Sequence, residues 1–176
     1  FSATRTLRAA QRLYEGMEVA GYGQIGLITY MRTDSLRIAD EAAAAARTFI
    51  SNNWGEPYVC AKKRAWKSRS ATAAQDAHEA IRPSMPELTP EQVEGSISGD
   101  EARLYRLIWS RFMASQIADC VMDTVSATIA AGDYLFRASG YHVTFDGFTA
   151  LYEESTDDKQ KKATALPPLE PGQVLD

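Results

Sequence analysis

Two short clusters of polar residues carry the chemistry that this sequence offers. The first lies in 26–35, where Tyr30 and Arg32 directly follow an apolar run. In an extended chain both side chains project to the same face, about 7 Å apart at the backbone. A tyrosine phenol holds its proton at neutral pH, so it needs cationic help to act as a covalent nucleophile. An arginine supplies that charge, and its forked guanidinium also suits a phosphate oxygen.

The second cluster lies in 75–83 and contains His78, Glu79 and Arg82. His78 and Arg82 are four residues apart, so a helical turn would bring them to one face. A histidine can shuttle a proton or hold a phosphate. Both clusters also have a plainer interpretation, in which Tyr30 packs on a sheet edge and Glu79 pairs with Arg82 on a surface helix. The spacing alone leaves these alternatives open.

The charge is distributed unevenly along the chain, although its net value is only −4. Residues 1–82 hold 12 Lys and Arg against 8 Asp and Glu, a balance of +4, whereas 83–176 hold 7 against 15, a balance of −8. A basic run with one tryptophan contains Lys62, Lys63, Arg64, Trp66, Lys67 and Arg69. A polyanion would prefer this half of the chain, although a solvated loop has the same composition.

Several classes of protein are excluded. Cys60 and Cys120 are sixty positions apart, which excludes a disulfide scaffold or a zinc knuckle and suits a reducing cytosol. The chain contains no run of eighteen or more apolar residues, which excludes a membrane-spanning helix. Asp34, Asp76 and Glu79 are too scattered to predict a metal site. With 45% apolar or aromatic residues among 176, the chain can bury a core.

The hydrophobic pattern predicts helices first and antiparallel strands after them, an α+β fold class. Helices are expected over 3–15, 39–52, 77–81, from Thr89 onward and over 100–118. The last helix is expected to bury a stripe that includes Leu104, Leu107 and Phe112. Strands are expected over 27–31, 58–60, 121–130 and 134–143, with a tight reversal at Asp146-Gly147. Phe1 is not an initiator Met and 172–176 resemble the start of a strand, so we expect a part of a longer protein.

Taken together, five motifs resemble the bacterial type IA DNA topoisomerases, in their topoisomerase I branch. They are LITYMRTDS at 27–35, AHEAIRP at 77–83, QRLYE at 11–15, IWSRFMASQ at 108–116 and FDGFT at 145–149. The resemblance covers essentially the whole chain. Met31 favours the topoisomerase I branch, because the topoisomerase III branch usually has proline there. The resemblance therefore favours the functional interpretation of both polar clusters.

The resemblance implies a role for each matching residue. Tyr30 matches the tyrosine that attacks a DNA phosphodiester and becomes linked to the 5′ phosphate. Arg32 matches the arginine that contacts the scissile phosphate, and His78 a histidine implicated in phosphate contact or proton handling. Thr33, Asp34 and Ser35 complete the motif and position its loop. The DNA-binding residues expected from the motifs and the basic run are Arg32, Thr33, Asp34, Ser35, His78, Arg82, Lys62, Lys63 and Trp66.

The resemblance also implies an architecture and an activity. Residues 1–118 would form a winged-helix-like or CAP-like tyrosine domain, and 119–176 part of a β-rich arch. The expected activity is ATP-independent relaxation of negative supercoils, in which single-stranded DNA is cleaved, passed and religated. Mg²⁺ would be held by an acidic cluster in a separate Toprim domain, so the isolated piece is expected to be inactive. The expected location is the cytoplasm, in association with the nucleoid.

Two alternatives remain at this stage. A non-catalytic winged-helix module would bind duplex DNA in a sequence-specific way and would not use the Tyr30 hydroxyl. The chain could also be the topoisomerase half of a larger fusion such as a reverse gyrase. One departure from the family pattern lies outside the catalytic positions: Ala39 stands where many relatives have a helix-capping serine, which costs roughly 1 kcal/mol.

Overall fold

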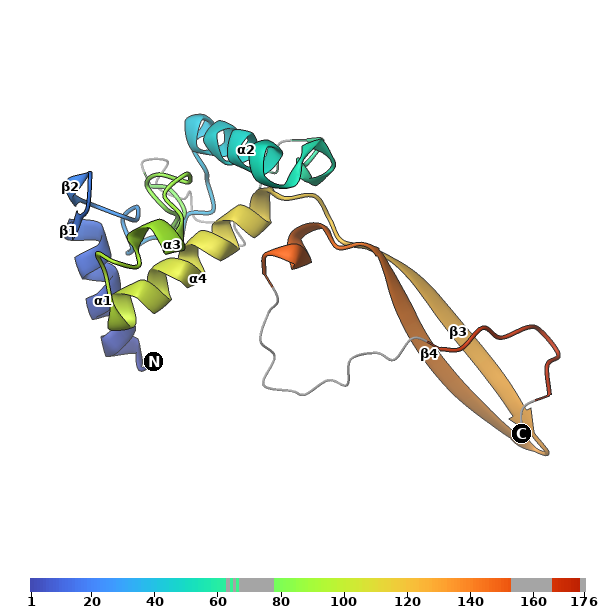
Figure 1. Ribbon diagram of the computed structural model, residues 1–176. Coiled ribbons are helices and arrows are strands. Elements are labelled where there is room, and N and C mark those ends of the chain that lie inside the picture. The colour runs from blue at the N-terminus through green and yellow to red at the C-terminus, as the bar shows by residue number, and fades with distance from the viewer. Residues whose placement is uncertain (63, 65, 67–77, 153–165, 175–176) are drawn as a thin grey trace. The chain divides into compact units, whose positions relative to one another are not determined.

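The computed structural model describes residues 1–62, 64, 66, 78–152 and 166–174, and they form two units, Phe1–Ala118 and Asp119–Asp176 (Figure 1). The first unit contains α1 (Ala3–Glu15), β1 (Met17–Val19), β2 (Gly23–Ile25), α2 (Asp40–Trp54), η1 (Glu56–Tyr58), α3 (Pro90–Val93) and α4 (Gly99–Gln116). The second contains β3 (Val121–Ala131), β4 (Tyr134–Phe145) and η2 (Gly147–Ala150). Helices with two antiparallel strand pairs confirm the α+β class.

Helix α1 begins and ends at the residues that its sequence predicts. The Ser2 hydroxyl accepts a hydrogen bond from the Arg5 N–H, which satisfies one free donor of the first turn. At the other end Gly16 has φ 130° and its N–H donates to the Arg12 carbonyl. That conformation suits glycine, since other residues rarely adopt it. Leu13 is fully buried on the inner face, so the predicted helix over 3–15 is confirmed.

Helix α4 lies at the centre of the first unit, but its buried face differs from the predicted one. Tyr105, Trp109 and Met113 are buried at intervals of four residues, whereas Leu107 is half exposed. The Tyr105 hydroxyl donates to the Leu88 carbonyl, and the Trp109 indole N–H donates to the Pro86 carbonyl. These polar partners allow both aromatic residues to be buried, whereas Leu107 is two residues from each of them and so lies on the opposite face of the helix. The predicted stripe was therefore wrong at Leu107, although the helix itself is confirmed.

Two shorter predictions have different outcomes. The helix start at Thr89 is confirmed by α3, where the Thr89 hydroxyl accepts from the Gln92 N–H and the Gln92 side chain accepts from the Thr89 N–H. The strand expected over 58–60 is wrong. Tyr58 ends η1, and only Val59 forms a bridge, to Ile117 at the end of α4. Next to this bridge, the Ala118 N–H donates to the Tyr58 carbonyl. The contact between 58–59 and 117–118 is therefore limited to this pair of residues on each side.

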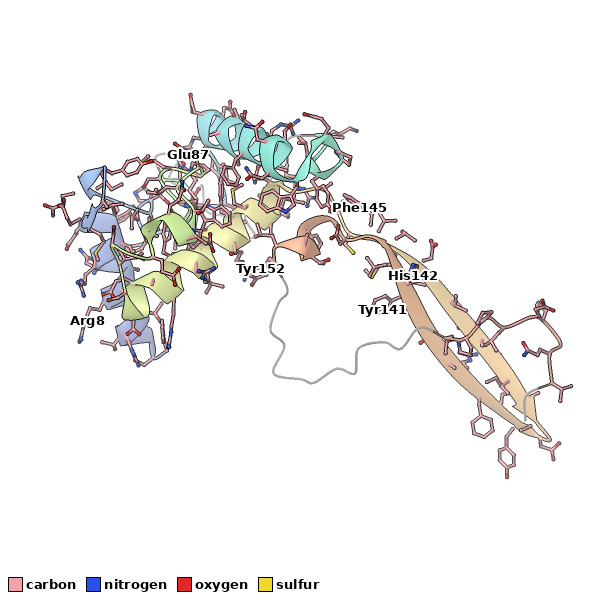
Figure 2. The ribbon with its side chains drawn as sticks, in the orientation of Figure 1. Arg8, Glu87, Tyr141, His142, Phe145 and Tyr152 are labelled. Atoms are coloured by element: carbon pink, nitrogen blue, oxygen red, sulfur yellow. The ribbon has the colours of Figure 1, made fainter. Side chains whose placement is uncertain are left out.

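The second unit is a long two-stranded hairpin, drawn in orange tones in Figure 1. Strands β3 and β4 pair from Ala131 opposite Tyr134 down to Val121 opposite Phe145, which confirms both predicted strands. His142 lies opposite Asp123 and is labelled on β4 in Figure 2. The reversal expected at Asp146-Gly147 is wrong: the chain enters the 3₁₀ turn η2 instead, with Asp146 in the helical region.

Most side chains of the hairpin are exposed on both of its faces. They include large apolar residues such as Val125, Leu135 and Phe136. The first unit, in contrast, has a contiguous core around α4 with Leu13, Ile50 and Ile117. Within the described residues, no helix is long and apolar enough to cross a bilayer.

Candidate active site

The segment that follows β2 is held against the end of α1. The Leu27 N–H donates to the Leu13 carbonyl at 2.7 Å. A Cβ atom on Gly26 would lie only 2.6 Å from the Tyr14 carbonyl oxygen, so residue 26 must be glycine for the two backbones to approach this closely. This crossing fixes where the chain carrying Tyr30 starts.

The same segment pairs with residues from the second polar cluster. Ile28 and Pro83 form an antiparallel bridge. On either side of it, the Thr29 N–H donates to the Arg82 carbonyl at 2.9 Å and the Ser84 N–H donates to the Leu27 carbonyl at 3.0 Å. The strand predicted over 27–31 is thus reduced to this short pairing. Its importance is that it joins two motifs about fifty residues apart in sequence.

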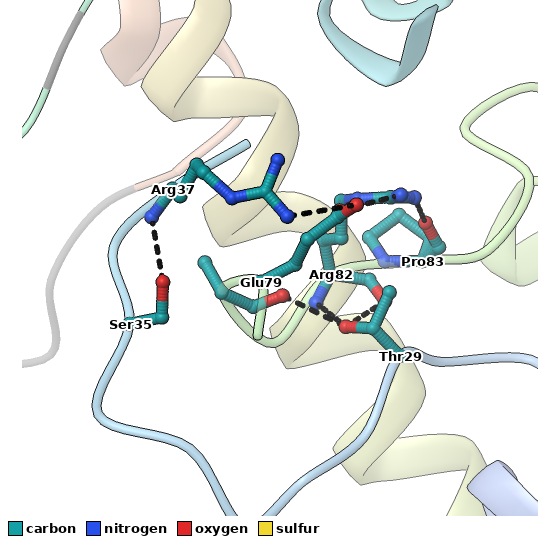
Figure 3. A network of polar contacts seen from close by, with 7 residues as sticks. Thr29, Ser35, Arg37, Glu79, Arg82 and Pro83 are labelled. Carbon is teal, nitrogen blue, oxygen red and sulfur yellow. Dashed lines mark hydrogen bonds and ion pairs between the residues drawn. The ribbon is translucent and has the colours of Figure 1, made fainter. Parts of the chain in front are cut away.

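The Thr29 hydroxyl strengthens the junction (Figure 3). It donates to the Ala80 carbonyl at 2.8 Å and accepts from the Arg82 N–H at 3.0 Å. One half-buried hydroxyl therefore satisfies two backbone groups of the other segment. Without the Thr29 hydroxyl, the Ala80 carbonyl and the Arg82 N–H would each lose a hydrogen bond at a partly buried position.

The helix predicted over 77–81 is wrong for the four residues that the structure describes, 78–81. Their backbone groups are used elsewhere: the Ala80 N–H donates to the Arg37 carbonyl, and the Ala80 carbonyl accepts from Thr29. A helix would need those groups for its own i to i−4 bonds. His78 and Arg82 are therefore not placed together by a helical turn. Residue 77 lies outside the described residues.

Tyr30 and His78 nevertheless meet. Their ring centroids are 5.8 Å apart with an interplanar angle of 57°. The ring of Tyr14, from the last turn of α1, lies edge-on to Tyr30 at 5.4 Å. Tyr30 remains 39% exposed and His78 is half-buried, so this group of three rings lies at the surface. A ligand from solvent can reach it.

The residues after Tyr30 alternate in exposure. Met31 is buried, while Arg32 and Asp34 are exposed on either side of the half-buried Thr33. The backbone bends at residues 29, 31 and 32, so the extended chain from which a shared face of Tyr30 and Arg32 was expected does not form, although both side chains are exposed. The hydroxyls of Thr33 and Ser35 hold the loop, because each accepts a hydrogen bond from the backbone N–H two residues later. Arg32 is thus presented to solvent by a loop with its own internal bonds.

Arg82 is bound within the protein in this arrangement. Its guanidinium donates to the Glu79 carboxylate at 2.7 and 2.8 Å and to the Pro83 carbonyl at 2.9 Å, and its side chain is only 12% exposed. Arg37 approaches the same carboxylate at 3.9 Å and is half exposed (Figure 3). These contacts give Arg82 a role in holding the junction, and they leave Arg37 the more accessible cation.

The basic run is only partly described. Lys62 and Trp66 are exposed, and the Arg64 guanidinium donates to the Ile117 carbonyl at 3.0 Å. Arg64 is therefore turned toward the end of α4. Lys63, Lys67 and Arg69 lie outside the described residues, so the structure does not place them.

Comparison with known proteins identifies the family. The sequence matches the DNA topoisomerase family over residues 1–176. The fold is similar to full-length topoisomerase I from Thermotoga maritima, with a TM-score of 0.78 and 35% sequence identity over 97% of this chain. The chain belongs to the bacterial type IA DNA topoisomerase family. It spans 26% of the length of the Thermotoga protein.

Family membership gives the junction a context, since it joins two of the five motifs that carry the family resemblance, 27–35 and 77–83. Three residues that the structure places at this candidate site were not among the site residues expected from the sequence: Tyr14, Thr29 and Arg37. The QRLYE motif contains Tyr14 and could have indicated it. Thr29 and Arg37 act through contacts with residues 79–82, for which a single sequence holds no signal. Among the described residues, no three His, Cys, Asp or Glu side chains gather where they could hold a metal ion.

Proposed function

We propose that this chain carries the DNA-cleaving tyrosine of a type IA topoisomerase, with Tyr30 as the nucleophile. The observation that supports it most is the contact between the Tyr30 and His78 rings across two motifs distant in sequence. Tyr30 is partly exposed, and Arg32, two residues later in the chain, is exposed, so a DNA backbone in solvent can reach both side chains. This combination offers a nucleophile, a permanent cation and a proton-handling group on one surface.

The proposed reaction is a reversible transesterification. The Tyr30 phenolic oxygen attacks the phosphorus of a DNA phosphodiester, a new P–O bond to tyrosine forms, and the bond to the 3′ oxygen breaks. The phenolic proton leaves for a base, and the departing 3′ oxygen takes up a proton. Because the tyrosyl ester conserves the phosphodiester, religation by the 3′ hydroxyl needs no ATP. Passage of a strand between these two steps would relax negative supercoils.

Arg32 and His78 have distinct parts in this proposal. Negative charge spreads over the non-bridging oxygens in the transition state, so a positioned cation contributes most. Arg32 supplies that charge, with a fork that matches two phosphate oxygens. His78, in contact with the Tyr30 ring, contributes a phosphate contact or handles the proton. Arg32 thus stabilises charge, and His78 either adds a second phosphate contact or moves the proton.

Single-stranded DNA is the proposed substrate. Lys62, Lys63 and Trp66 offer the basic and aromatic groups that track such a strand. Thr33, Asp34 and Ser35 shape the loop beside the phosphate, where Thr33 and Ser35 hold the backbone. For Arg82 we propose an indirect contribution, since Glu79 and Pro83 already occupy its guanidinium. The substrate implies work in a bacterial cytoplasm, on the DNA of the nucleoid.

The complete reaction is proposed to need other parts of a type IA enzyme. Mg²⁺, held by acidic residues of a Toprim domain outside these 176 residues, would stabilise negative charge on the DNA phosphate. The remaining arch would form the rest of the gate through which a strand passes. Within this chain, we propose that 1–118 form the winged-helix-like tyrosine domain and that 119–176 form part of the arch.

An adduct experiment tests the proposal. The complete enzyme that contains this chain is incubated with a single-stranded oligonucleotide labelled at its 3′ end or its 5′ end. A 5′-phosphotyrosyl link predicts that only the 3′ label stays with the protein, and that mass spectrometry finds the adduct at Tyr30. A retained 5′ label, or an adduct on another residue, contradicts the assignment.

The non-catalytic alternative makes different predictions. A winged-helix module without catalysis would bind a specific duplex and form no adduct. Affinity for single- and double-stranded DNA of the same sequence, measured across salt concentrations, separates the two because phosphate contacts set the salt dependence. Tighter binding of the single strand, together with an adduct, supports the topoisomerase proposal. No observation on the described residues favours the alternative.

A further inference from the structure

The ring of Tyr14 is the nearest aromatic neighbour of Tyr30 in the described structure. It lies edge-on to Tyr30 at 5.4 Å between centroids, closer than His78 at 5.8 Å. Edge-to-face pairs are favoured because the positive edge of one ring meets the negative face of the other. This contact therefore restrains how the Tyr30 ring is turned.

The restraint does not come from burial. Tyr14 is 41% exposed and Tyr30 is 39% exposed, so neither ring belongs to the core. A half-exposed tyrosine without neighbours would exchange among side-chain rotamers. The surface contact with Tyr14 limits that freedom while it leaves Tyr30 open to a ligand.

The backbone holds the two tyrosines in register. Gly16 ends α1 two residues after Tyr14, and the Leu27 N–H donates to the Leu13 carbonyl. The close approach of Gly26 to the Tyr14 carbonyl leaves no space for a side chain between them. Tyr14 is thus carried by a packed helix end at a fixed distance from the start of the tyrosine segment.

We propose that Tyr14 is a positioning residue, whose ring orients the phenol of Tyr30 for attack on the DNA phosphate. The inference rests on the proposed function of Tyr30 and adds a residue that acts through it. Displacement requires the attacking oxygen to lie in line with the leaving oxygen. Small errors in such positioning cost rate, because fewer encounters have the reactive geometry.

The test uses the complete enzyme with three variants at this position, Tyr14→Ala, Tyr14→Leu and Tyr14→Phe. Tyr22→Ala is the matched control, since Tyr22 is another half-exposed tyrosine, in the turn between β1 and β2. The measured quantities are the rate of adduct formation at saturating 3′-labelled oligonucleotide, the Kd for that oligonucleotide, and Tm. Phenylalanine keeps the ring, leucine fills the space without one, and alanine does neither.

The proposal predicts that Tyr14→Ala and Tyr14→Leu form the adduct about three- to tenfold more slowly, with Kd within about twofold of wild type. Tyr14→Phe and Tyr22→Ala should keep the wild-type rate, and Tm should change little in Tyr14→Leu. This pattern separates ring orientation from general packing.

Three results would overturn the inference. The first is a wild-type rate of adduct formation in Tyr14→Leu. The second is a Tyr14→Phe variant that forms the adduct as slowly as Tyr14→Ala. The third is weaker oligonucleotide binding by Tyr14→Ala with an unchanged rate of adduct formation, which would make Tyr14 a DNA contact. Failure of the underlying function looks different, because Tyr30→Phe would then still form the adduct.

Discussion

At the residue scale, one hydroxyl adds two hydrogen bonds to the backbone pairing that joins the two motifs. Thr29 satisfies the Ala80 carbonyl and the Arg82 N–H, while its own N–H pairs with the Arg82 carbonyl. The rings of Tyr30, next to Thr29, and of His78, two residues before Ala80, are in contact beside this junction. Thr29 therefore links the stability of the fold to the geometry of the proposed site.

Thr29→Val tests this link. Valine keeps the shape but leaves both backbone groups of 80–82 unpaired, so we expect the free energy of unfolding to fall by about 1–3 kcal/mol. Chemical denaturation followed by tryptophan fluorescence measures it, and Trp54, Trp66 and Trp109 all report on the first unit. Thr29→Ser is the control, because it keeps the hydroxyl. Equal stability of the valine and serine variants would show that the hydroxyl contributes nothing.

At the element scale, α2 begins at a residue that cannot cap it. Ala39 has the extended conformation of an N-cap, and the structure gives it no side-chain hydrogen bond. Ala39→Ser should raise the free energy of unfolding by about 1 kcal/mol, since a serine oxygen can accept from the free N–H groups of the first turn.

Denaturation of the Ala39→Ser variant measures the gain, and Ala44→Ser is its matched control. Ala44 is exposed in the interior of α2, where serine is a poorer helix former than alanine and should lower stability by about 0.5 kcal/mol. A gain at both positions would point to a general effect of serine and contradict the capping argument.

The pair between α1 and α4 predicts a dependence on pH. The side-chain hydrogen bond from Arg5 lowers the pKa of Asp100 below its ordinary 3.8, and the charge of Arg5 adds to this. A carboxyl with a lowered pKa in the folded state stabilises the fold above its unfolded pKa and loses that contribution as pH falls through the folded value. The stabilisation should therefore disappear below about pH 4, with a small amplitude because the pair is exposed.

Asp100→Asn should remove this part of the pH dependence. The measurement is Tm of the variant and of wild type between pH 6 and pH 2.5, where the two curves are expected to converge toward the acid end. Asp133→Asn, in the exposed turn between β3 and β4, serves as the control. A constant Tm difference across the range would mean that Asp100 does not act through its charge.

The elements also show what a single sequence can predict. Helices α1, α2 and α4 and the hairpin strands were predicted because their apolar period and turn residues are local signals. The helix over 77–81 was not correct, because Thr29 and Arg37 take the backbone bonds of Ala80 from another part of the chain. For the same reason, the sequence predicted that Tyr30 and His78 have chemical roles but not that their rings touch.

At the scale of the whole molecule, the chain spans 26% of the Thermotoga enzyme and places no acidic metal cluster among its described residues. If Mg²⁺ and the rest of the gate come from other parts of the enzyme, the 176-residue chain alone should not relax a negatively supercoiled plasmid. Agarose gel electrophoresis after incubation with Mg²⁺ measures this, and the complete enzyme is the positive control. Relaxation by the isolated chain would contradict the division of labour that we propose.

The most direct test of the central claim replaces one atom. In the complete enzyme, Tyr30→Phe removes the phenolic oxygen and leaves the ring that contacts Tyr14 and His78. The account predicts that this variant binds a single-stranded oligonucleotide with nearly wild-type affinity and forms no covalent adduct with it. Covalent capture of the 3′-labelled strand by Tyr30→Phe would contradict the account.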